Sequence, residues 1–374
     1  MPPRPLRVAA VRDLGPQFTD NPYRMVGQDG AYSIPLGSAG PQEADRVFWY
    51  FGDTLIGERP PGSLRDVFTH LAEIGEPEGH RPFERMPTNT GLVLPAQSGR
   101  GGLTGFVHLT DAHGEIRQLV PAGPGDRDGW DRMWCMHGIA LGETLYLLYM
   151  HIRMLENKGG PFDLGFEIIG CGMAKGSVYD WQFERLHHDG EAMWWRYPSP
   201  QFASAVLQVE GDDGTWLYFY GVTGYEAGVQ QAYLARVRPE DIEHLDRYTY
   251  LSGSDSSGSE PTWSADIAEA IPIFDGPPNE LSITWNAYLG SYLAVHSYNT
   301  DGKQVGRTAP HPWGPWSAPV TLWTVEGGPD KKYPVAAYAG KEHPSLSEDG
   351  GRVIYVTYIE AEEYFPHLLE VTLA

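Results

Sequence analysis

The feature of this sequence that most constrains its fold is a two-part strand pattern that recurs five times along the chain. Each copy has a short, partly apolar strand, a turn, and then a strongly apolar, aromatic strand. Two of the turns contain Asp213-Gly214 and Asp349-Gly350, pairs that tolerate the positive φ angles of tight hairpins. Helical periodicity is nearly absent, so the pattern predicts an all-β chain. The five copies are Ala31–Leu36 with Arg46–Phe51, His137–Leu141 with Thr144–Met150, Phe202–Val209 with Trp216–Val222, Leu281–Trp285 with Ser291–Ser297, and His343–Leu346 with Arg352–Ile359.

Five copies of one multi-stranded antiparallel unit predict a five-bladed β-propeller, a ring that leaves only protected sheet edges. A β-sandwich with coincidental hairpins is the alternative, but a sandwich does not require the same strong strand to return five times. The N-terminal strand Leu6–Val11 is expected to pair beside Val371 and close the ring. We therefore expect a single domain, with blades at about 27–110, 130–186, 200–251, 279–324 and 341–374, the last completed by about 5–12.

The charge and apolar content of the chain exclude several classes of partner. With 49 acidic and 27 basic residues in 374, the net charge of −22 argues against a nucleic-acid partner. The best apolar run, Leu145–Met150, is far shorter than the roughly 18 residues of a membrane span. Cys135 and Cys171 fall on strands too far apart for a disulfide, so both are expected to be free thiols. No secretory signal opens the sequence, so we expect a protein that is cytoplasmic as written, or secreted with its leader removed.

Propeller geometry predicts where functional side chains gather. The innermost strands run parallel to one another around the channel, so the residues that precede them meet at one mouth. The second strand of the first blade returns to the same mouth at Asp53. The residues that precede the five innermost strands are Asp29, His137, Gln201, Glu280, and Glu342 with His343.

Asp29 and Asp53 are expected to face each other across the first hairpin. A constant register that pairs Ala31 with Phe51 also pairs these two residues, with their Cα atoms about 4.5–5.5 Å apart. Two adjacent carboxyls separate their pKa values, which is what acid–base cleavage of a glycosidic bond requires. The simpler alternative is a pair of turn residues, because each Asp has a glycine as its neighbour.

Further side chains are expected to bind substrate around this catalytic pair. The candidates are Glu280, His343, His137, Gln201, Asn89, Trp134 and Trp285. The tryptophans would stack on sugar rings, although tryptophan in propellers more often packs between blades. No His, Asp or Glu spacing forms a recognisable metal motif, so no metal ligand is assigned and no cofactor is expected to be required.

Several stretches carry a resemblance to a known family. Gly27–Leu36 (GQDGAYSIPL) and Phe48–Thr54 (FWYFGDT), followed by Asn279–Thr284 and His343–Leu346, resemble domain-of-unknown-function family 4185. That family includes the endo-D-arabinanases of glycoside hydrolase family 183. The similarity runs from about Gly27 to the end of the chain. The chain departs from the family pattern in a first hairpin lengthened by residues 38–44 and in the missing secretion signal.

The resemblance implies a five-bladed propeller that cleaves furanosidic linkages, such as D-arabinofuranosyl linkages, with Asp29 and Asp53 as its essential carboxylates. We therefore expect a glycoside hydrolase that acts on an oligo- or polysaccharide at one mouth of the channel. One alternative is a non-catalytic propeller that binds a glycan or a protein and holds a cation such as Ca²⁺ at the Asp pair. A glycoside phosphorylase or a biosynthetic enzyme on the same fold is another.

Overall fold

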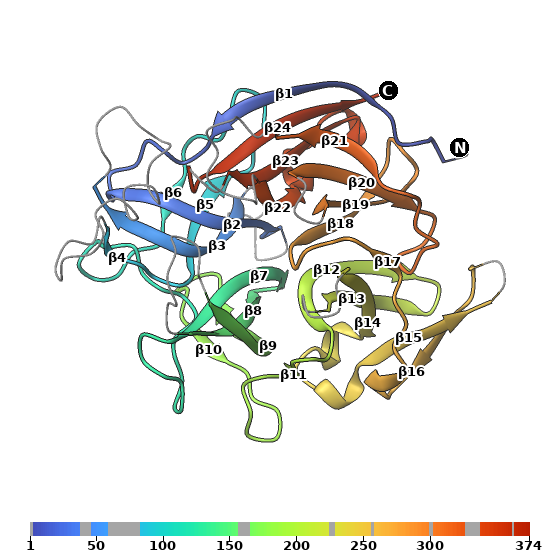
Figure 1. Ribbon diagram of the computed structural model, residues 1–374, viewed down its shortest axis with the longest axis horizontal. Coiled ribbons are helices and arrows are strands. Elements are labelled where there is room, and N and C mark those ends of the chain that lie inside the picture. Colours follow the sequence, from blue (N-terminus) through green and yellow to red (C-terminus); the bar gives the residue numbers. More distant parts are fainter. Residues whose placement is uncertain are drawn as a thin grey trace.

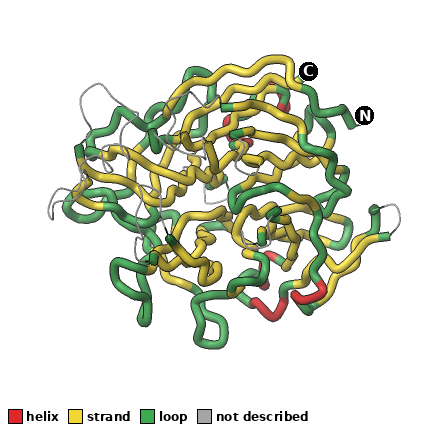
Figure 2. Tube along the Cα trace, viewed as in Figure 1, coloured by secondary structure: helices red, strands yellow, loops and turns green. Residues whose placement is uncertain are grey.

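The structure is a computed structural model that describes residues 3–37, 46–58, 83–155, 165–223, 229–255, 258–298, 302–325, 337–360 and 363–374. These residues form five antiparallel sheets arranged around a centre, so the predicted five-bladed β-propeller is confirmed (Figure 1). The helical segments among them are short 3₁₀ turns (Figure 2). The turns are η2 (Pro239–Asp241), η3 (Leu245–Arg247), η4 (Ile267–Glu269), η5 (Pro344–Leu346) and η6 (Asp349–Gly351).

Each blade is one sheet, and its strands follow one another in the chain, apart from β1. Blade 1 holds β2 (Met25–Pro35), β3 (Arg46–Gly57), β4 (Phe83–Arg85), β5 (Thr90–Pro95) and β6 (Val107–His108). Blade 2 holds β7 (Asp131–Leu141), β8 (Thr144–Met154), β9 (Phe166–Ser177), β10 (Phe183–Arg185) and β11 (Trp195–Arg196). Blade 3 holds β12 (Gln201–Gly211), β13 (Gly214–Val222), β14 (Gln231–Val237), β15 (Thr249–Ser254), β16 (Pro261–Ser264) and β17 (Phe274–Asp275). Blade 4 holds β18 (Leu281–Asn286), β19 (Ser291–Tyr298), β20 (Lys303–Ala309) and β21 (Val320–Thr324). Blade 5 holds β22 (Ala337–Glu342), β23 (Val353–Glu360), β24 (Pro366–Leu373) and β1 (Val8–Pro16).

The first strand of each blade faces the centre of the ring. β2, β7, β12, β18 and β22 contact one another in this order, and β22 contacts β2 again (Figure 1). The strands behind them are apolar on both sides because each blade lies between two others. In β3, for example, every residue after Arg46 is buried. A sheet covered on both faces needs continuous apolar runs, which explains the strong second strand of the repeat.

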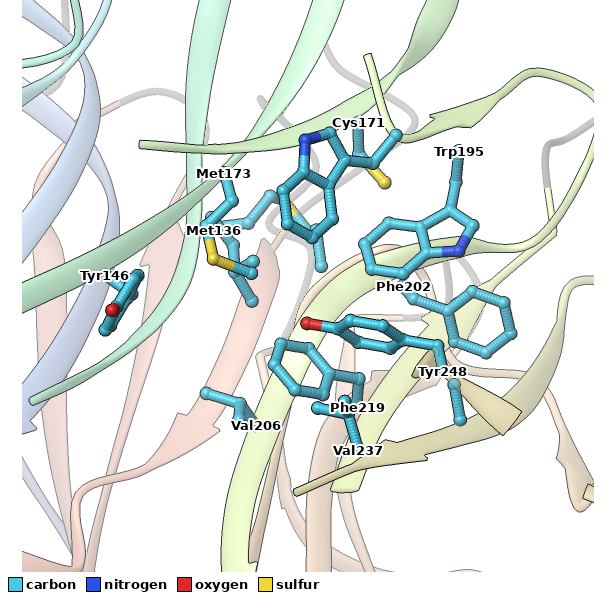
Figure 3. Close-up of a cluster of buried hydrophobic side chains, with 14 of the residues drawn as sticks. Met136, Tyr146, Cys171, Met173, Trp195, Phe202, Val206, Phe219, Val237 and Tyr248 are labelled. Atoms are coloured by element: carbon cyan, nitrogen blue, oxygen red, sulfur yellow. The ribbon is translucent and has the colours of Figure 1, made fainter. Parts of the chain in front are cut away.

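The core consists of layers between neighbouring blades. Figure 3 shows the layer between blades 2 and 3, where Trp195 packs against Phe202 at 5.5 Å and against Tyr248 at 5.4 Å between ring centroids. The Trp195 indole nitrogen also donates to the Tyr250 hydroxyl at 3.1 Å, so its polar atom is satisfied inside the layer. Cys171 lies in this layer as a free thiol, and Cys135 is likewise buried and free, as predicted.

The ends of the chain meet in blade 5, but its first strand differs from the prediction. β1 pairs with β24, and Val11 lies opposite Val371, so the predicted ring closure is confirmed. The strand predicted at His343–Leu346 is wrong, because Pro344 begins the turn η5. Proline has no N–H to donate to a strand ladder, and the innermost strand is instead β22, directly before His343.

The lengthened hairpin at residues 38–44 lies outside the described residues. None of the helical segments in the described ranges has the length and apolar character needed to cross a lipid bilayer.

The strand pair that closes the ring contains a buried, charged histidine. His367 on β24 contacts Asp13 on β1 at 3.4 Å and Glu363 at 2.8 Å, and the Tyr358 hydroxyl donates to Asp13 at 2.8 Å. Burial alone would lower the pKa of His367, but the hydrogen bonds to Asp13 and Glu363 outweigh burial and raise this pKa to about 9. Protonated His367 therefore ties the N-terminal strand to the last strand.

We expect the free energy of unfolding to fall as the pH rises from about 6.5 to about 9, because the folded state binds the His367 proton more tightly than the unfolded state. Protonated His367 contributes roughly 3 kcal/mol to the free energy of unfolding below about pH 6.5, and this contribution is lost by about pH 9. Denaturant unfolding across this pH range would measure the loss, and His367→Gln should remove most of it. His244→Gln, an exposed histidine on blade 3, is the control. An unchanged pH slope in His367→Gln would contradict the assignment.

Candidate active site

The hairpin of β2 and β3 brings Asp29 and Asp53 together, but not as a regular pair. The predicted register holds from Tyr32 to Pro35 and again at Gln28. Between these regions Gly30, rather than Ala31, lies opposite Phe51, so Asp29 lies opposite the two residues Gly52 and Asp53 in an irregular stretch and not in a regular one-to-one pair. Gly30 and Ala31 have φ angles of +85° and +70°, which mark the irregular positions in the hairpin.

Glycines on both strands make room for neighbouring side chains, Gly52 for the Asp29 carboxylate and Gly30 for the Cys135 thiol. A Cβ atom at Gly52 would collide with Asp29 Oδ1, and one at Gly30 would collide with Cys135 Sγ. Both glycines therefore belong to the packing of the site and do not form a surface turn, which was the simpler alternative for the two Asp-Gly neighbours. The backbone at Gly30 and Gly52 can lie this close to the Cys135 and Asp29 side chains because glycine has no side chain of its own.

Asp29 is a half-buried carboxylate that receives two phenol hydrogen bonds. Tyr364 donates to Oδ2 at 2.9 Å and Tyr338 donates to the same atom at 3.3 Å. Burial raises the pKa of Asp29, the charge of Asp53 raises it further, and Glu280 adds a smaller effect, so that the pKa reaches about 7 despite the two donors. A large fraction of Asp29 is therefore protonated near neutral pH.

Asp53 has a different environment, because a cation lies beside it. Arg132 and Trp134, both on β7 of the next blade, donate to Oδ2 at 3.1 and 3.2 Å. Burial raises the pKa of Asp53, and the Arg132 charge opposes this effect. Asp53 is 8% exposed, and its Oδ1 accepts no hydrogen bond from the described residues. Of the two coupled carboxyls, the one that faces a guanidinium ionises first, so Asp53 is the anion and Asp29 keeps the proton.

A buried lysine, Lys341, acts electrostatically on the carboxylates of this site, and it was not predicted from the sequence. Lys341 is 1% exposed, its Nζ donates to the Ala339 carbonyl at 2.9 Å, and it lies 4.2 Å from the centroid of the Tyr32 ring. Burial lowers the pKa of Lys341 to about 8, against the opposing charges of Glu280, Cys135 and Asp29. Glu280 is half-buried, and burial raises its pKa while Lys341 lowers it. Lys341 is thus the local counter-charge for Glu280.

An irregularity in β22 brings two of these side chains to one site. Tyr338 and Lys341 are three residues apart, a spacing that sends side chains to opposite faces of a regular strand. The register shifts between them, and Ala339 has a φ angle of +57°. Tyr338 therefore reaches Asp29 while Lys341 acts electrostatically on Asp29 and Glu280. The only sequence signal for Lys341 was its place directly before the predicted mouth residues.

Several predicted substrate-binding residues are occupied elsewhere in the fold. His343 is buried, with its ring nitrogens 2.8 and 2.7 Å from the hydroxyls of Ser33 and Thr357. Asn89 is buried and uses its amide to bind backbone groups of residues 119, 120 and 133. Gln201 is buried, and its Nε2 donates to the Ser199 carbonyl at 2.6 Å. The structure does not bring these three side chains to the Asp pair as free binding groups.

Of the remaining predicted residues, His137 and Trp134 lie on β7 beside blade 1, whereas Trp285 lies at the far end of β18. His137 is half-buried beside Tyr32, 5.5 Å between ring centroids, and burial lowers its pKa to about 4, so it is neutral. Trp134 binds Asp53, as described above, rather than standing free as a stacking platform. Trp285 lies near the opposite end of β18 from Glu280, about 17 Å along the strand at the usual rise per residue. It therefore does not belong to this site.

Metal-ligating side chains cluster away from the Asp pair. Among the described residues, the groups that could hold an ion are Asp126 with Asp131 and His151, and Glu360 with Glu363 and His367. The first group contacts the guanidinium groups of Arg153 and Arg185, and the second surrounds the His367 ion pairs. Asp29 and Asp53 belong to neither group.

The chain is similar to a known protein family and to several solved structures. A family model described as a domain of unknown function (DUF4185) matches residues 15–369. A candidate hydrolase from Bacteroides ovatus has a similar structure, with a TM-score of 0.60 and 16% identity over 95% of this chain and 87% of that chain. A GH43_1 enzyme from Xanthomonas citri complexed with xylose has a TM-score of 0.49 and 14% identity, over 98% of this chain and 91% of that chain. A family 117 glycoside hydrolase from Zobellia galactanivorans has a TM-score of 0.48 and 9% identity, over 97% and 90%. The search of curated proteins found no match.

Proposed function

Because this chain belongs to the DUF4185 family, whose model spans nearly all of it, we propose that it is a glycoside hydrolase that cleaves furanosidic linkages with Asp29 and Asp53. The observation that carries the proposal is the contrast between these carboxyls. One is held by phenols with a pKa of about 7, and the other is held by a guanidinium. The furanosidic substrate rests on the family resemblance of the segments that contain the two aspartates.

Asp29 is the general acid in this mechanism. Its protonated carboxyl donates to the glycosidic oxygen as the bond to the leaving sugar breaks, which avoids the departure of an alkoxide. A general acid works best when its pKa is close to the working pH, and burial together with the neighbouring Asp53 charge provides that match. Tyr338 and Tyr364 hold the carboxyl in one orientation.

Asp53 supplies the negative charge on the other side of the reacting carbon. It acts either as the base that takes a proton from water or as the nucleophile that attacks the sugar, two routes that differ in carboxyl separation and product stereochemistry. Arg132 and Trp134 bind its Oδ2 and leave Oδ1 without a hydrogen bond among the described residues. Oδ1 is itself buried, so in this proposal a water molecule or a sugar hydroxyl must reach it to supply the hydrogen bond that the described residues do not.

The proposal is tested by incubating the protein with D-arabinan, L-arabinan, galactofuranan and xylan, and measuring new reducing ends. We expect release from a furanosidic polymer and none from xylan. Cleavage of xylan alone would support a glycosidase but contradict the furanosidic substrate. No release from any polymer, with retained binding, would favour the non-catalytic glycan-binding alternative.

The pH profile provides a specific test of the acid. Activity should fall as the pH rises through about 7, because Asp29 loses its proton. Tyr364→Phe removes a donor that lowers the pKa of Asp29, so the alkaline limb should move to higher pH. Tyr338→Phe should move it in the same direction by less, since its hydrogen bond is longer. Tyr288→Phe, in the turn between β18 and β19, is the control. A limb that stays in place or moves to lower pH would contradict the role of Asp29.

A further inference from the structure

We infer that the propeller carries a second saccharide-binding site, separate from the Asp pair, in an aromatic pocket between blades 3 and 4. The pocket has a volume of about 490 Å³, within the range of small-ligand sites. Its lining comes from β12, the β12–β13 turn, β13, β14, β16, β18 and β19, and from residues 310–313. Four tryptophans line it: Trp216, Trp263, Trp285 and Trp313.

The pocket lies at the opposite end of the hairpins from the proposed active site. In blade 4, Glu280 precedes β18, whereas Trp285 lies next to its last residue and pairs with Tyr292. In blade 3, Gln201 is the first residue of β12, whereas the pocket is lined by Gly211, the last residue of β12, and by the turn that follows it. A ligand in this pocket is therefore bound independently of the site formed by Asp29 and Asp53.

Stacked cations hold the inner wall in place. The Arg236 guanidinium lies between two indoles, 4.0 Å from the centroid of Trp216 and 4.1 Å from that of Trp263. Arg238 lies 3.6 Å from the Trp216 centroid and also donates to Asp213 at 3.3 Å. A wall of alternating rings and guanidiniums is rigid, so a ligand would not have to order these side chains on binding.

Trp285 presents a large apolar surface to solvent at the edge of the pocket. It is 53% exposed and is held by an edge-to-face contact with Tyr292, at 5.1 Å between ring centroids. Across the same pocket, Trp313 stacks on His311 at 4.9 Å with ring planes 7° apart, and the Trp313 indole nitrogen donates to the Gly258 carbonyl at 3.1 Å. An exposed indole beside preorganised rings is typical of a surface that stacks on another ring or apolar face.

Polar groups around these rings favour a neutral saccharide as the ligand. The carboxylates of Asp212 and Asp213 lie exposed on the rim, and that of Asp213 also accepts from the Trp216 indole nitrogen at 3.1 Å. A sugar ring offers C–H faces to an indole and hydroxyl groups that donate to carboxylates. Acidic polymers are disfavoured by the carboxylates and by the net charge of −22. A proline-rich peptide also fits aromatic grooves, but its proline nitrogens offer no hydrogen to the carboxylates.

The experiment uses full-length protein that carries Asp53→Asn, so that no ligand is hydrolysed. It is titrated by calorimetry with hexasaccharides of xylose, of D-arabinofuranose and of β-1,3-linked galactose, and with a proline-rich decapeptide. We expect at least one hexasaccharide to bind, and Trp285→Ala to weaken this binding at least about tenfold, the loss expected for one stacked ring. Trp285→Phe should retain most of the affinity, because it keeps an aromatic face.

Controls separate this site from the proposed active site and from misfolding. Trp130→Ala removes another exposed indole, 41% exposed, and should leave binding unchanged. Thermal unfolding should show that Trp285→Ala folds, since the side chain is largely exposed. Binding that is insensitive to Trp285→Ala, binding of the decapeptide alone, or no binding at all would overturn the inference. The inference does not rest on catalysis by the Asp pair, so an inactive wild-type protein that binds sugar through Trp285 would contradict only the proposed function.

Discussion

Asp53→Asn is expected to lower kcat by about 10³- to 10⁴-fold while the protein stays folded. Asparagine has nearly the same shape and can still accept hydrogen bonds from Arg132 and Trp134, but it can neither take a proton from water nor attack a sugar. Initial rates on the polymer cleaved by the wild type would measure the loss. Asp246→Asn, at an exposed position in η3, is the matched control and should be fully active.

Asp29→Asn distinguishes the two roles, because it removes only the proton donor. It should be as inactive as Asp53→Asn on natural linkages, yet recover much of its rate on an aryl glycoside, whose leaving group departs without protonation. Asp53→Asn should show no such recovery, and the double variant should be little worse than either single variant. Activity within tenfold of the wild type in both single variants would show that the pair does not perform the reaction.

Gly52→Ala is expected to reduce kcat about 10²-fold, although no catalytic group is changed. The new Cβ would collide with Asp29 Oδ1, so the carboxylate must move away from its phenol donors and its place beside Asp53. A displacement of about 1 Å in a reacting group is enough for a loss of this size. Gly52 does not have a positive φ angle, so an alanine at this position should cause little backbone strain.

The matched control for this variant is Gly37→Ala, because a Cβ there meets no atom of the described residues within 4 Å and Gly37 does not have a positive φ angle. It should leave both activity and thermal stability unchanged. Activity measurements on both variants, paired with unfolding curves, separate displacement of Asp29 from general destabilisation. Normal activity in Gly52→Ala would show that the Asp29 carboxylate tolerates another position.

Part of the site was predictable because hairpins bring residues together locally. Asp29 and Asp53 lie on adjacent strands of one ribbon, so a count along the strands placed them as neighbours. The regular register predicted for them is interrupted by the irregular positions at Gly30 and Ala31. Such irregularities depend on how the chain packs, here against Cys135 of the next blade, and not on the strand pattern.

The surroundings of the pair were not predictable, and His343 illustrates why. Its position in the chain suggested a binding residue, yet contacts with Ser33 and Thr357 bury it between blades. Tyr364 is more than 300 positions from Asp29 and still donates to it. No pattern in a single segment indicates such a contact, because it arises only when blades 1 and 5 dock.

The sequence by itself determined the number of blades, the closure of the ring by its two ends, and the ribbon that carries both aspartates. These properties follow from the alternation of apolar strands and turns, which is local and repeats. Only the tertiary structure decided which carboxyl faces Arg132, which faces the phenols, and that Lys341 is buried beside them. The physical reason is that a pKa and a side-chain orientation depend on charges and burial contributed by other blades, and these are created when the sheets pack around a common centre.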